Sequence, residues 1–215
     1  MKNNLKKRIN TSVILLFLLF LIFKFDLFLI YCLIVLGVLS IIEFSNLTKK
    51  IFLRSFNINI LNIFFSIYIF SFCLVFVFLS NFIVLKIILY ISLLGCIASD
   101  IGGFIFGKIF KGPKITKISP NKTYSGSIGS IIFSSSLVSF LTSYFFDIWN
   151  FKIVLIGIII SIFCQCGDLL FSFLKRKAKI KDTGNFFPGH GGVLDRIDGI
   201  ILGVPFGLIT FAFLN

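Results

Sequence analysis

Long apolar stretches dominate this chain of 215 residues and leave it few ways to fold. Most of them are long enough, as helices, to cross the ~30 Å hydrocarbon core of a bilayer. The stretches are residues 12–23, 27–44, 58–79, 82–98, 127–146, 153–173 and 199–214. The mean hydropathy is +1.07 and 13% of the residues are charged, whereas soluble domains carry about a quarter. We therefore predict an all-α, polytopic transmembrane helical bundle with about seven spans.

The first stretch is short for a span. Residues 12–23 run into Lys24-Phe25-Asp26, so they form either a full crossing or half of a shallow hairpin. Basic residues before an apolar run also resemble a secretory signal, but no small-residue cleavage site follows. We therefore predict that this segment is retained.

The basic residues are distributed asymmetrically about the spans. With the N-terminus in the cytoplasm, 18 of the 21 Lys and Arg residues fall on the cytoplasmic side, as the positive-inside rule predicts. They lie in the N-terminal tail and in the connections 45–57, 99–126 and 174–198. Orientation alone explains those in the tail and in 45–57. In the other two connections they are interleaved with Gly, Ser, Pro and carboxylates, which orientation does not require.

These connections suggest a division of the chain by role. We predict that residues 1–98 are N-terminal transmembrane helices that act as a scaffold. Residues 99–215 form a catalytic transmembrane region with two cytoplasmic motif loops, 99–126 and 172–198. The net charge of +13 is concentrated on the cytoplasmic face, where it meets anionic lipid headgroups. No nucleic-acid partner is expected.

Two carboxylates lie at or inside the end of a predicted span, where an ionised group is costly unless it is paired or bound to metal. They are Asp100 and Asp168. Ser172, Lys175 and Arg176 follow Asp168 at helical spacing and share a face with it. Asp168 is therefore either a functional group or one half of an intrahelical ion pair.

Asp195 and Asp198 open the last predicted span, and their spacing points both side chains to one side of a helix. Capping of the helix N-terminus accounts for one of them. Together with Asp168 they form an oxygen-rich ligand set of the kind that Mg²⁺ accepts, with phosphates and water completing the octahedron.

His190 is the only histidine, and it stands in a Gly-rich segment before Gly191 and Gly192. Glycines allow a ligand to approach the backbone closely. His190 then donates to a phosphate or acts as an acid–base group. The alternative is a structural role in a turn.

Residues 119–126 form the first motif, which precedes the span 127–146. The polar residues of 172–198 described above form the second motif. The sequence S-P-N-K-T-Y-S-G contains Ser119, Lys122, Thr123 and Gly126. Such a cluster at a helix N-terminus is a natural anion-binding site. The residue order of a Walker A motif is absent, so the loop is not of that type.

Together these motifs resemble the C-terminal signature of the phosphatidate cytidylyltransferase, or CDP-diacylglycerol synthase, family. The matching residues are Ser172, Lys175, Arg176, Lys181, Asp182, Gly184, Phe187, Pro188, His190, Gly191, Gly192, Asp195, Arg196 and Asp198. The resemblance extends upstream to residues 165–168, to Asp100 and to residues 119–126. The chain departs from the family in having fewer N-terminal spans, and in having Tyr124-Ser125 where many members have Trp-Glu.

The resemblance implies a nucleotidyltransferase of phospholipid biosynthesis that converts CTP and phosphatidate to CDP-diacylglycerol and pyrophosphate. It implies that Asp168 and Asp195 hold Mg²⁺, that Asp198 is a ligand or orients one, and that a monovalent cation can accompany the metal. It also implies a homodimer in the bacterial cytoplasmic (inner) membrane, with the active site facing the cytoplasm.

The implied site contains two sets of residues. The catalytic set is Asp168, Asp195, Asp198, Lys175, Arg176 and His190. The substrate-binding set is Asp100, Ser119, Lys122, Thr123, Gly126, Ser172, Lys181, Asp182, Gly191, Gly192 and Arg196. Among these, Lys and Arg side chains are expected at the phosphates, because they form charge-assisted hydrogen bonds.

Three other functions remain open at this point. A CDP-archaeol synthase or polyprenol kinase would use a similar site on another lipid. An ion-coupled transporter would also need intramembrane carboxylates, but transporters place them near the midplane in repeated halves, and no repeat is visible here. The third alternative is an inactive protein that keeps the fold.

Overall fold

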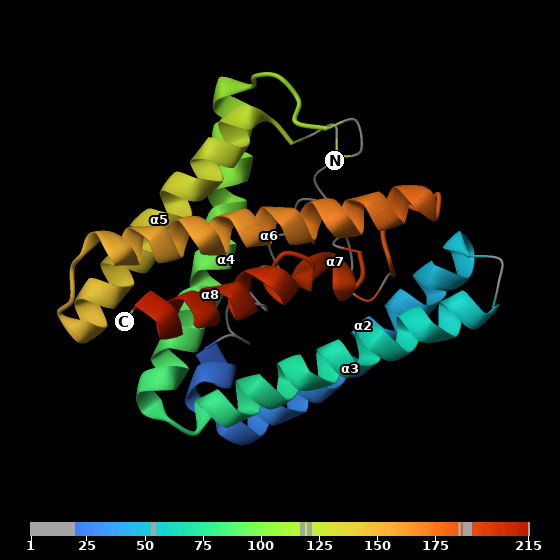
Figure 1. Ribbon diagram of the computed structural model, residues 1–215, viewed down its shortest axis with the longest axis horizontal. Coiled ribbons are helices and arrows are strands. Elements are labelled where there is room, and N and C mark those ends of the chain that lie inside the picture. The colour runs from blue at the N-terminus through green and yellow to red at the C-terminus, as the bar shows by residue number, and fades with distance from the viewer. Residues whose placement is uncertain are drawn as a thin grey trace, which may run out of the picture. The chain divides into compact units, whose positions relative to one another are not determined.

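The computed structural model describes residues 20–52, 55–116, 119, 122–184, 186 and 191–214, and every named element within them is a helix. The elements are α2 (Asp26–Ile51), α3 (Ser55–Ser80), α4 (Ile83–Phe110), α5 (Tyr124–Phe146), α6 (Phe151–Lys177), α7 (Leu194–Ile197) and α8 (Ile200–Leu214) (Figure 1). The predicted all-α class is confirmed.

Six helical segments of the described residues are long and apolar enough to cross a membrane, so the chain is a multi-pass membrane protein. They are Asp26–Ile51, Phe56–Ser80, Ile83–Phe110, Tyr124–Phe146, Phe151–Lys177 and Leu194–Phe213. They correspond to six of the seven predicted stretches. Of the first stretch only residues 20–23 are described, and these are helical. The cytoplasmic position of the N-terminus stays a prediction.

Two helices continue well past the apolar stretches that predicted them. The helix α4 runs on to Phe110, so that Asp100 lies within it and residues 111–123 connect it to α5. The helix α6 runs on to Lys177, which places Lys175 and Arg176 in its last turn. Cations are stabilised there by the negative end of the helix dipole.

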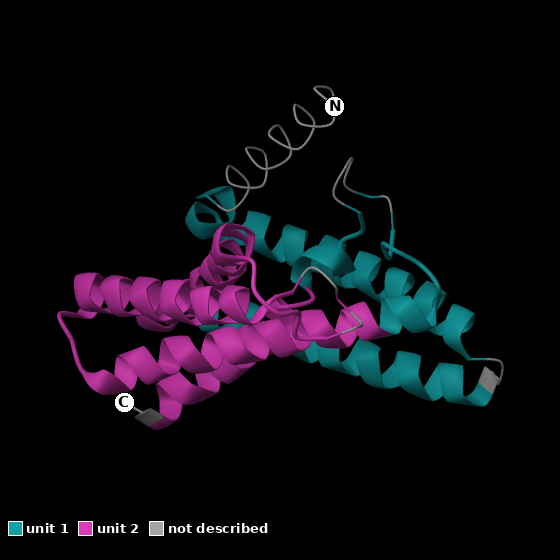
Figure 2. Cartoon of the chain, turned by 90° about the horizontal axis from the view of Figure 1, so that it is seen from above, with its two compact units in different colours: residues 1–80, 174–197 teal, residues 81–173, 198–215 magenta. Residues whose placement is uncertain are grey.

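The chain divides into two compact units (Figure 2). Unit 1 comprises residues 1–80 and 174–197, and unit 2 comprises residues 81–173 and 198–215. Most of the second predicted motif loop therefore belongs to the same unit as the N-terminal helices. The predicted division at residue 98, which concerns roles, stays a prediction.

Small residues bring the helices of unit 2 close together. A Cβ atom on Gly102 of α4 would lie 2.5 Å from the carbonyl oxygen of Gly129 on α5. Such close backbone contact through small residues is typical of membrane helices. The buried hydroxyls of Ser99 on α4 and Ser161 on α6 lie 2.9 Å apart and share a hydrogen bond. Asp100 follows Ser99 directly, so this contact holds its part of α4 against α6.

In unit 1, α2 and α3 run side by side (Figure 1). Phe44 stacks on Phe65 with ring centroids 3.9 Å apart. Near the end of α2, Thr48 Oγ1 donates to Asn62 Oδ1 at 2.9 Å. Hydrogen bonds between membrane helices contribute about 0.6 kcal/mol on average, so packing provides most of the attraction between these helices.

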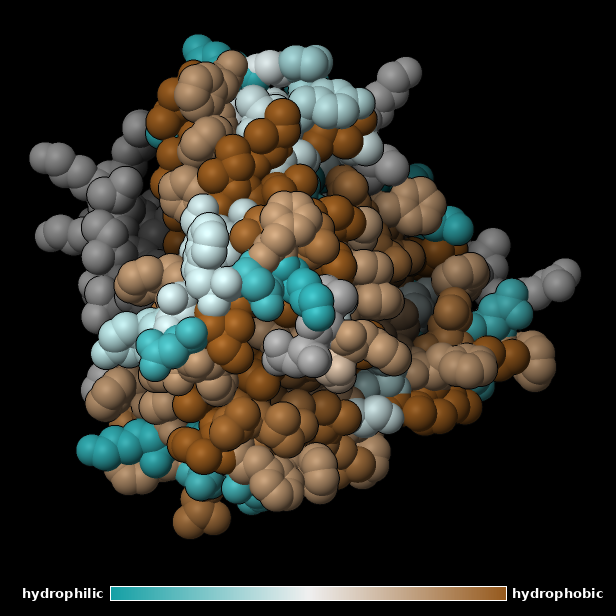
Figure 3. Space-filling view, turned by 60° about the vertical axis from the view of Figure 1, so that its left-hand side comes forward, coloured by the Kyte–Doolittle hydropathy of each residue, from teal (hydrophilic) through white to brown (hydrophobic). Residues whose placement is uncertain are grey.

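Large apolar side chains cover much of the surface, as expected for helices solvated by lipid. In unit 1, Phe64 is 69% exposed and Phe70 is 64% exposed, and in unit 2 the value for Phe104 is 70%. On the face drawn in Figure 3, apolar residues predominate and hydrophilic residues form separate patches.

Candidate active site

A cavity of about 270 Å³ in unit 2 brings together the first motif and the carboxylates Asp100 and Asp168. Its walls come from α4, α5, α6 and the loop before α5, with the residues Asp100, Gly103, Phe104, Lys122, Thr123, Gly126, Ser127, Ser130, Gln165 and Asp168. Lys122 Nζ lies 3.0 Å from Asp168 Oδ2, and these side chains are 26% and 22% exposed. The pair is therefore accessible to a ligand that enters the cavity.

The loop between α4 and α5 fixes the position of Lys122. It folds back on itself through an antiparallel bridge between Lys114 and Thr123, and Ile115 N donates to Lys122 O at 3.0 Å. Thr123 then caps α5, because its Oγ1 accepts from Gly126 N at 3.1 Å. The first turn of α5 lines the cavity, where the positive end of the helix dipole favours an anion.

Asp100 contributes the second carboxylate of this cavity from α4. Its Oδ1 lies 3.7 Å from Cys164 Sγ on α6. The amide of Gln165 lines the same cavity. Asp100, Asp168 and Lys122 thus offer two oxygen-donor groups and one ammonium, a combination that suits a phosphate group accompanied by a divalent cation.

Asp195 is the centre of a separate set of contacts in unit 1. Its Oδ1 accepts from Lys175 Nζ at 2.7 Å, and its Oδ2 accepts from the backbone N–H of Thr183 at 2.8 Å and of Gly192 at 3.0 Å. The side chains of Lys175 and Asp195 are 13% and 5% exposed. A buried ion pair is stable only when further hydrogen bonds satisfy it, and the two backbone donors supply them.

Glu43 belongs to the same part of unit 1 and was not among the predicted site residues. It lies on α2 and is 8% exposed. Its carboxylate accepts hydrogen bonds from the Thr183 hydroxyl and from the backbone N–H groups of Val193 and Leu194. Its position inside the apolar stretch 27–44 could have indicated it, because an ionisable residue within a span is a functional candidate by default.

The remaining predicted residues of the second motif lie at or near the surface. The exposed ones are Arg176, Lys181, Asp182 and Arg196, and the partly exposed ones are Ser172, Gly191 and Asp198. Gly191 has φ +82°, a backbone conformation that explains a glycine there. In the first motif, Ser119 O accepts from Lys122 N at 3.1 Å. His190 lies outside the described residues, so its role stays a prediction.

The predicted metal ligands are divided between the units, with Asp168 and Asp198 in unit 2 and Asp195 in unit 1. Within the described part of the chain, no group of three or more His, Cys, Asp or Glu side chains is arranged to hold a metal. Asp168 does lie next to Gly199, which directly follows Asp198. A Cβ atom on Gly199 would be 2.9 Å from Asp168 Oδ1. The convergence of all three carboxylates stays a prediction.

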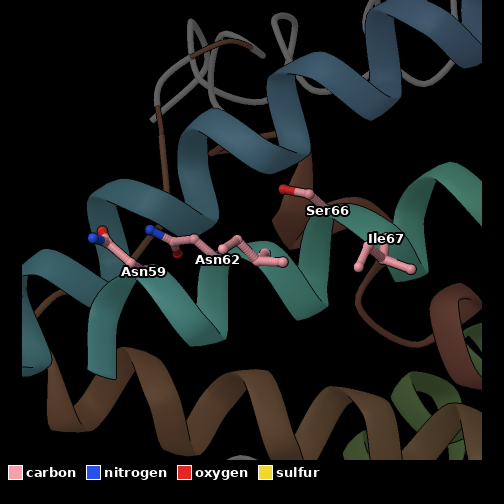
Figure 4. Close-up of a pocket in the computed structure, with 5 residues that line it drawn as sticks. Asn59, Asn62, Ser66 and Ile67 are labelled. Atoms are coloured by element: carbon pink, nitrogen blue, oxygen red, sulfur yellow. The ribbon is translucent and has the colours of Figure 1, made fainter. Parts of the chain in front are cut away.

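A second hollow, of about 400 Å³, lies along α3 in unit 1 and contains none of the predicted site residues (Figure 4). Its lining residues are Asn59, Asn62, Ile63, Ser66 and Ile67. Asn62 is engaged with α2, since it accepts from Thr48 and its Nδ2 donates to Ser45 Oγ at 3.3 Å. Asn62 therefore serves the packing of α2 and α3.

The fold and these contacts define a helical membrane protein with polar, phosphate-compatible groups at the ends of its spans. The family model described as the cytidylyltransferase family matches residues 6–214. The chain therefore belongs to the cytidylyltransferase family.

Individual relatives agree with this assignment. A phosphatidate cytidylyltransferase of Rickettsia felis is 47% identical over 126 residues, which cover 54% of this chain and 55% of the relative. A phosphatidate cytidylyltransferase of Helicobacter pylori (strain ATCC 700392 / 26695) is 40% identical over 107 residues, covering 50% of this chain and 40% of the relative. The chain thus spans about half the length, or less, of these curated relatives.

Proposed function

We propose that this protein transfers the cytidylyl group of CTP to phosphatidate and so makes CDP-diacylglycerol and pyrophosphate. Support comes from the family and from relatives that carry the name phosphatidate cytidylyltransferase. The structural observation that carries the proposal is the cavity in which the Lys122–Asp168 pair, Asp100 and the capped first turn of α5 meet.

In the proposed reaction, a phosphate oxygen of phosphatidate attacks the α-phosphorus of CTP. The bond between that phosphorus and the oxygen bridging to the β-phosphorus breaks, and pyrophosphate leaves with the electron pair. Such a transfer requires positioning and neutralisation of charge more than covalent chemistry by the protein. The chain needs cations and a fixed geometry at the phosphates.

Lys122 is well placed to bind a phosphate. Its ammonium group has three donors and gives one to Asp168 at 3.0 Å. A phosphate bound in the cavity accepts from the remaining donors of Lys122 and lies near the positive end of the α5 dipole. The other cations proposed to bind phosphates are Lys175, Arg176, Lys181 and Arg196.

We also propose Mg²⁺ as the cofactor, with Asp168, Asp195 and Asp198 as its ligands and a monovalent cation as an accessory. Carboxylate oxygens are the donors that Mg²⁺ prefers, and Asp168 lies beside the segment that carries Asp198. The metal, when bound, supplies positive charge to the leaving pyrophosphate. Lys175 Nζ lies 2.7 Å from Asp195 Oδ1.

The proposed setting is the cytoplasmic face of the bacterial inner membrane. The positive-inside rule supports this orientation, because it places both motif loops where CTP and the headgroup of phosphatidate are accessible. From the family resemblance, we also propose that the protein is a homodimer embedded in membrane lipids.

The test is conversion of phosphatidate by the detergent-purified protein with Mg²⁺ and CTP labelled at its α-phosphate. Label should enter the organic phase, and EDTA should abolish the transfer until excess Mg²⁺ is added. Parallel reactions with an archaeol-type ether phosphate and with a polyprenol test the two related lipid functions. Transfer to either of these and not to phosphatidate would overturn the choice of substrate.

A further inference from the structure

Glu43 is a buried carboxylate inside a membrane span, and the chemistry described above does not use it. It lies near the end of the apolar stretch 27–44, and α2 itself continues to Ile51. An ionisable side chain inside a span is costly unless its partners compensate it. The identity of those partners therefore indicates what Glu43 does.

The groups that donate hydrogen bonds to Glu43 lie in the second motif, far along the chain from α2. Glu43 Oε1 accepts from the backbone N–H of Val193 at 2.9 Å. Glu43 Oε2 accepts from the backbone N–H of Leu194 at 2.9 Å and from Thr183 Oγ1 at 2.7 Å. The carboxylate thus binds two successive N–H groups at the start of α7, where the helix dipole favours a negative charge.

Thr183 links Glu43 to Asp195. Its hydroxyl lies 2.7 Å from Glu43 Oε2 and 3.1 Å from Asp195 Oδ2, and its backbone N–H donates to Asp195 Oδ2. A hydroxyl has one proton to donate, so the shorter contact to Glu43 leaves the backbone N–H as the firm bond to Asp195. A change in the position of Glu43 is therefore transmitted through one residue to Asp195.

Two glycines of the motif are explained by contact with Glu43. A Cβ atom on Gly184 would lie 2.5 Å from Glu43 Oε1. A Cβ atom on Gly192 would collide with both oxygens of Glu43 and would lie 2.5 Å from Thr183 Oγ1. The motif therefore leaves room for an internal carboxylate at these two positions.

We propose that Glu43 is the positioning residue for the second motif: it holds Thr183 and the start of α7 so that Asp195 and the Gly192 N–H keep the arrangement that the reaction requires. The catalytic part of this inference rests on the proposed cytidylyl transfer. The positioning part rests on the contacts alone, and it assigns an active role to a helix that the sequence suggested was only a scaffold.

The decisive variant is Glu43→Gln, because glutamine has the same shape but replaces one acceptor oxygen by an NH₂ group that opposes a backbone donor. Asp26→Asn is the matched control, since it makes the same change of charge at the exposed start of the same helix. Hydrogen–deuterium exchange of the peptide covering residues 191–195 is measured in the full-length protein in detergent. The kcat, calculated per folded protein, and the KM for CTP are also measured.

Glu43→Gln should accelerate exchange at residues 193 and 194 and lower kcat by about 10²-fold, the size expected when a reacting group is misplaced by about 1 Å. The KM for CTP should change less than threefold. Asp26→Asn should change neither quantity. Unaltered exchange in Glu43→Gln, or a lower melting temperature with an unchanged kcat per folded protein, would overturn the proposal.

A second pair of variants covers the case in which Glu43→Gln does not fold. Thr183→Val removes the hydroxyl that Glu43 binds, so it should also accelerate exchange and lower kcat, but less than Glu43→Gln does. Thr183→Ser keeps the hydroxyl and should behave like the wild-type protein. Equal behaviour of these two variants contradicts the link. If the wild-type protein transfers no label to any lipid, the proposed function fails, and the exchange experiment still decides whether Glu43 positions the motif.

Discussion

Within the described residues, two carboxylate–lysine pairs, one in each unit, differ in how firmly they are held. In unit 2, Lys122 and Asp168 are 26% and 22% exposed and line a cavity. In unit 1, Lys175 and Asp195 are 13% and 5% exposed, and Asp195 also accepts two backbone N–H bonds. The first pair is accessible to a ligand, whereas the second is part of a rigid network that includes Glu43.

This difference in exposure predicts different costs of substitution. An accessible pair contributes little to stability, typically 0–1 kcal/mol. Its residues can therefore contact the substrate without a large loss of folding free energy. A buried pair is costly to break, about 3–5 kcal/mol when one partner is removed. Substitutions in the Lys175–Asp195 network should therefore affect folding and activity together, and substitutions of Lys122 or Asp168 should affect mainly activity.

The largest effect is expected for Asp195→Asn. It removes the carboxylate of a buried ion pair, which should destabilise the protein by about 3–5 kcal/mol and lower turnover by orders of magnitude. Asp168→Asn should lower turnover comparably while the melting temperature in detergent changes little. Equal melting temperatures for the two variants would contradict the distinction between the pairs, and near-normal activity in either would contradict its proposed role as a metal ligand.

Gly192→Ala should have the next largest effect. The added methyl group overlaps the Glu43 carboxylate and the Thr183 hydroxyl, and overpacking of this kind costs about 1–3 kcal/mol. The measurement is the melting temperature in detergent, compared with Gly37→Ala on α2, where the new methyl group would meet its nearest neighbours at an ordinary 3.5 Å. A loss no greater than that of Gly37→Ala would show that the motif is looser than described.

Lys122→Ala should act mainly on substrate binding. It removes a phosphate donor and an accessible ion pair, so the KM for CTP should rise about tenfold, as expected for the loss of one charge-assisted hydrogen bond. Stability should fall by no more than about 1 kcal/mol. Steady-state kinetics and a thermal melt measure both. A large loss of stability with an unchanged KM would reverse the roles assigned to the two pairs.

Lys49→Ala should have the smallest effect. Lys49 is exposed in the last turn of α2 and is interpreted as a residue that only orients the chain. Activity and melting temperature should stay within experimental error of the wild-type values. A clear loss of activity would mean that the connection 45–57, which includes Lys49, also takes part in catalysis.

The sequence predicted the spans well because their signal is local. Continuous apolar composition identified six helices now found in the structure. Their ends were less predictable: α4 continues to Phe110 because a helix satisfies its own backbone hydrogen bonds whether or not lipid surrounds it. The pairing of Lys122 with Asp168 joins two motifs that the sequence identified separately but could not place side by side.

Glu43 was missed for a different reason. Its partners Thr183, Val193 and Leu194 lie more than a hundred residues away, and two of the three bonds use backbone N–H groups, which leave no trace in side-chain identity. The glycines at 184 and 192 were conspicuous in the sequence. Their contact with a carboxylate on α2 could be seen only in three dimensions.

Cytidylyl transfer to phosphatidate is tested most directly by the position of the label in CTP. The purified protein is given phosphatidate, Mg²⁺ and CTP labelled at either the α- or the γ-phosphate. If the protein transfers the cytidylyl group, α-label enters the lipid and γ-label is recovered only in pyrophosphate. Recovery of γ-label in the lipid would show phosphoryl transfer instead, and absence of both labels from lipid and pyrophosphate would contradict any nucleotidyl transfer by this protein.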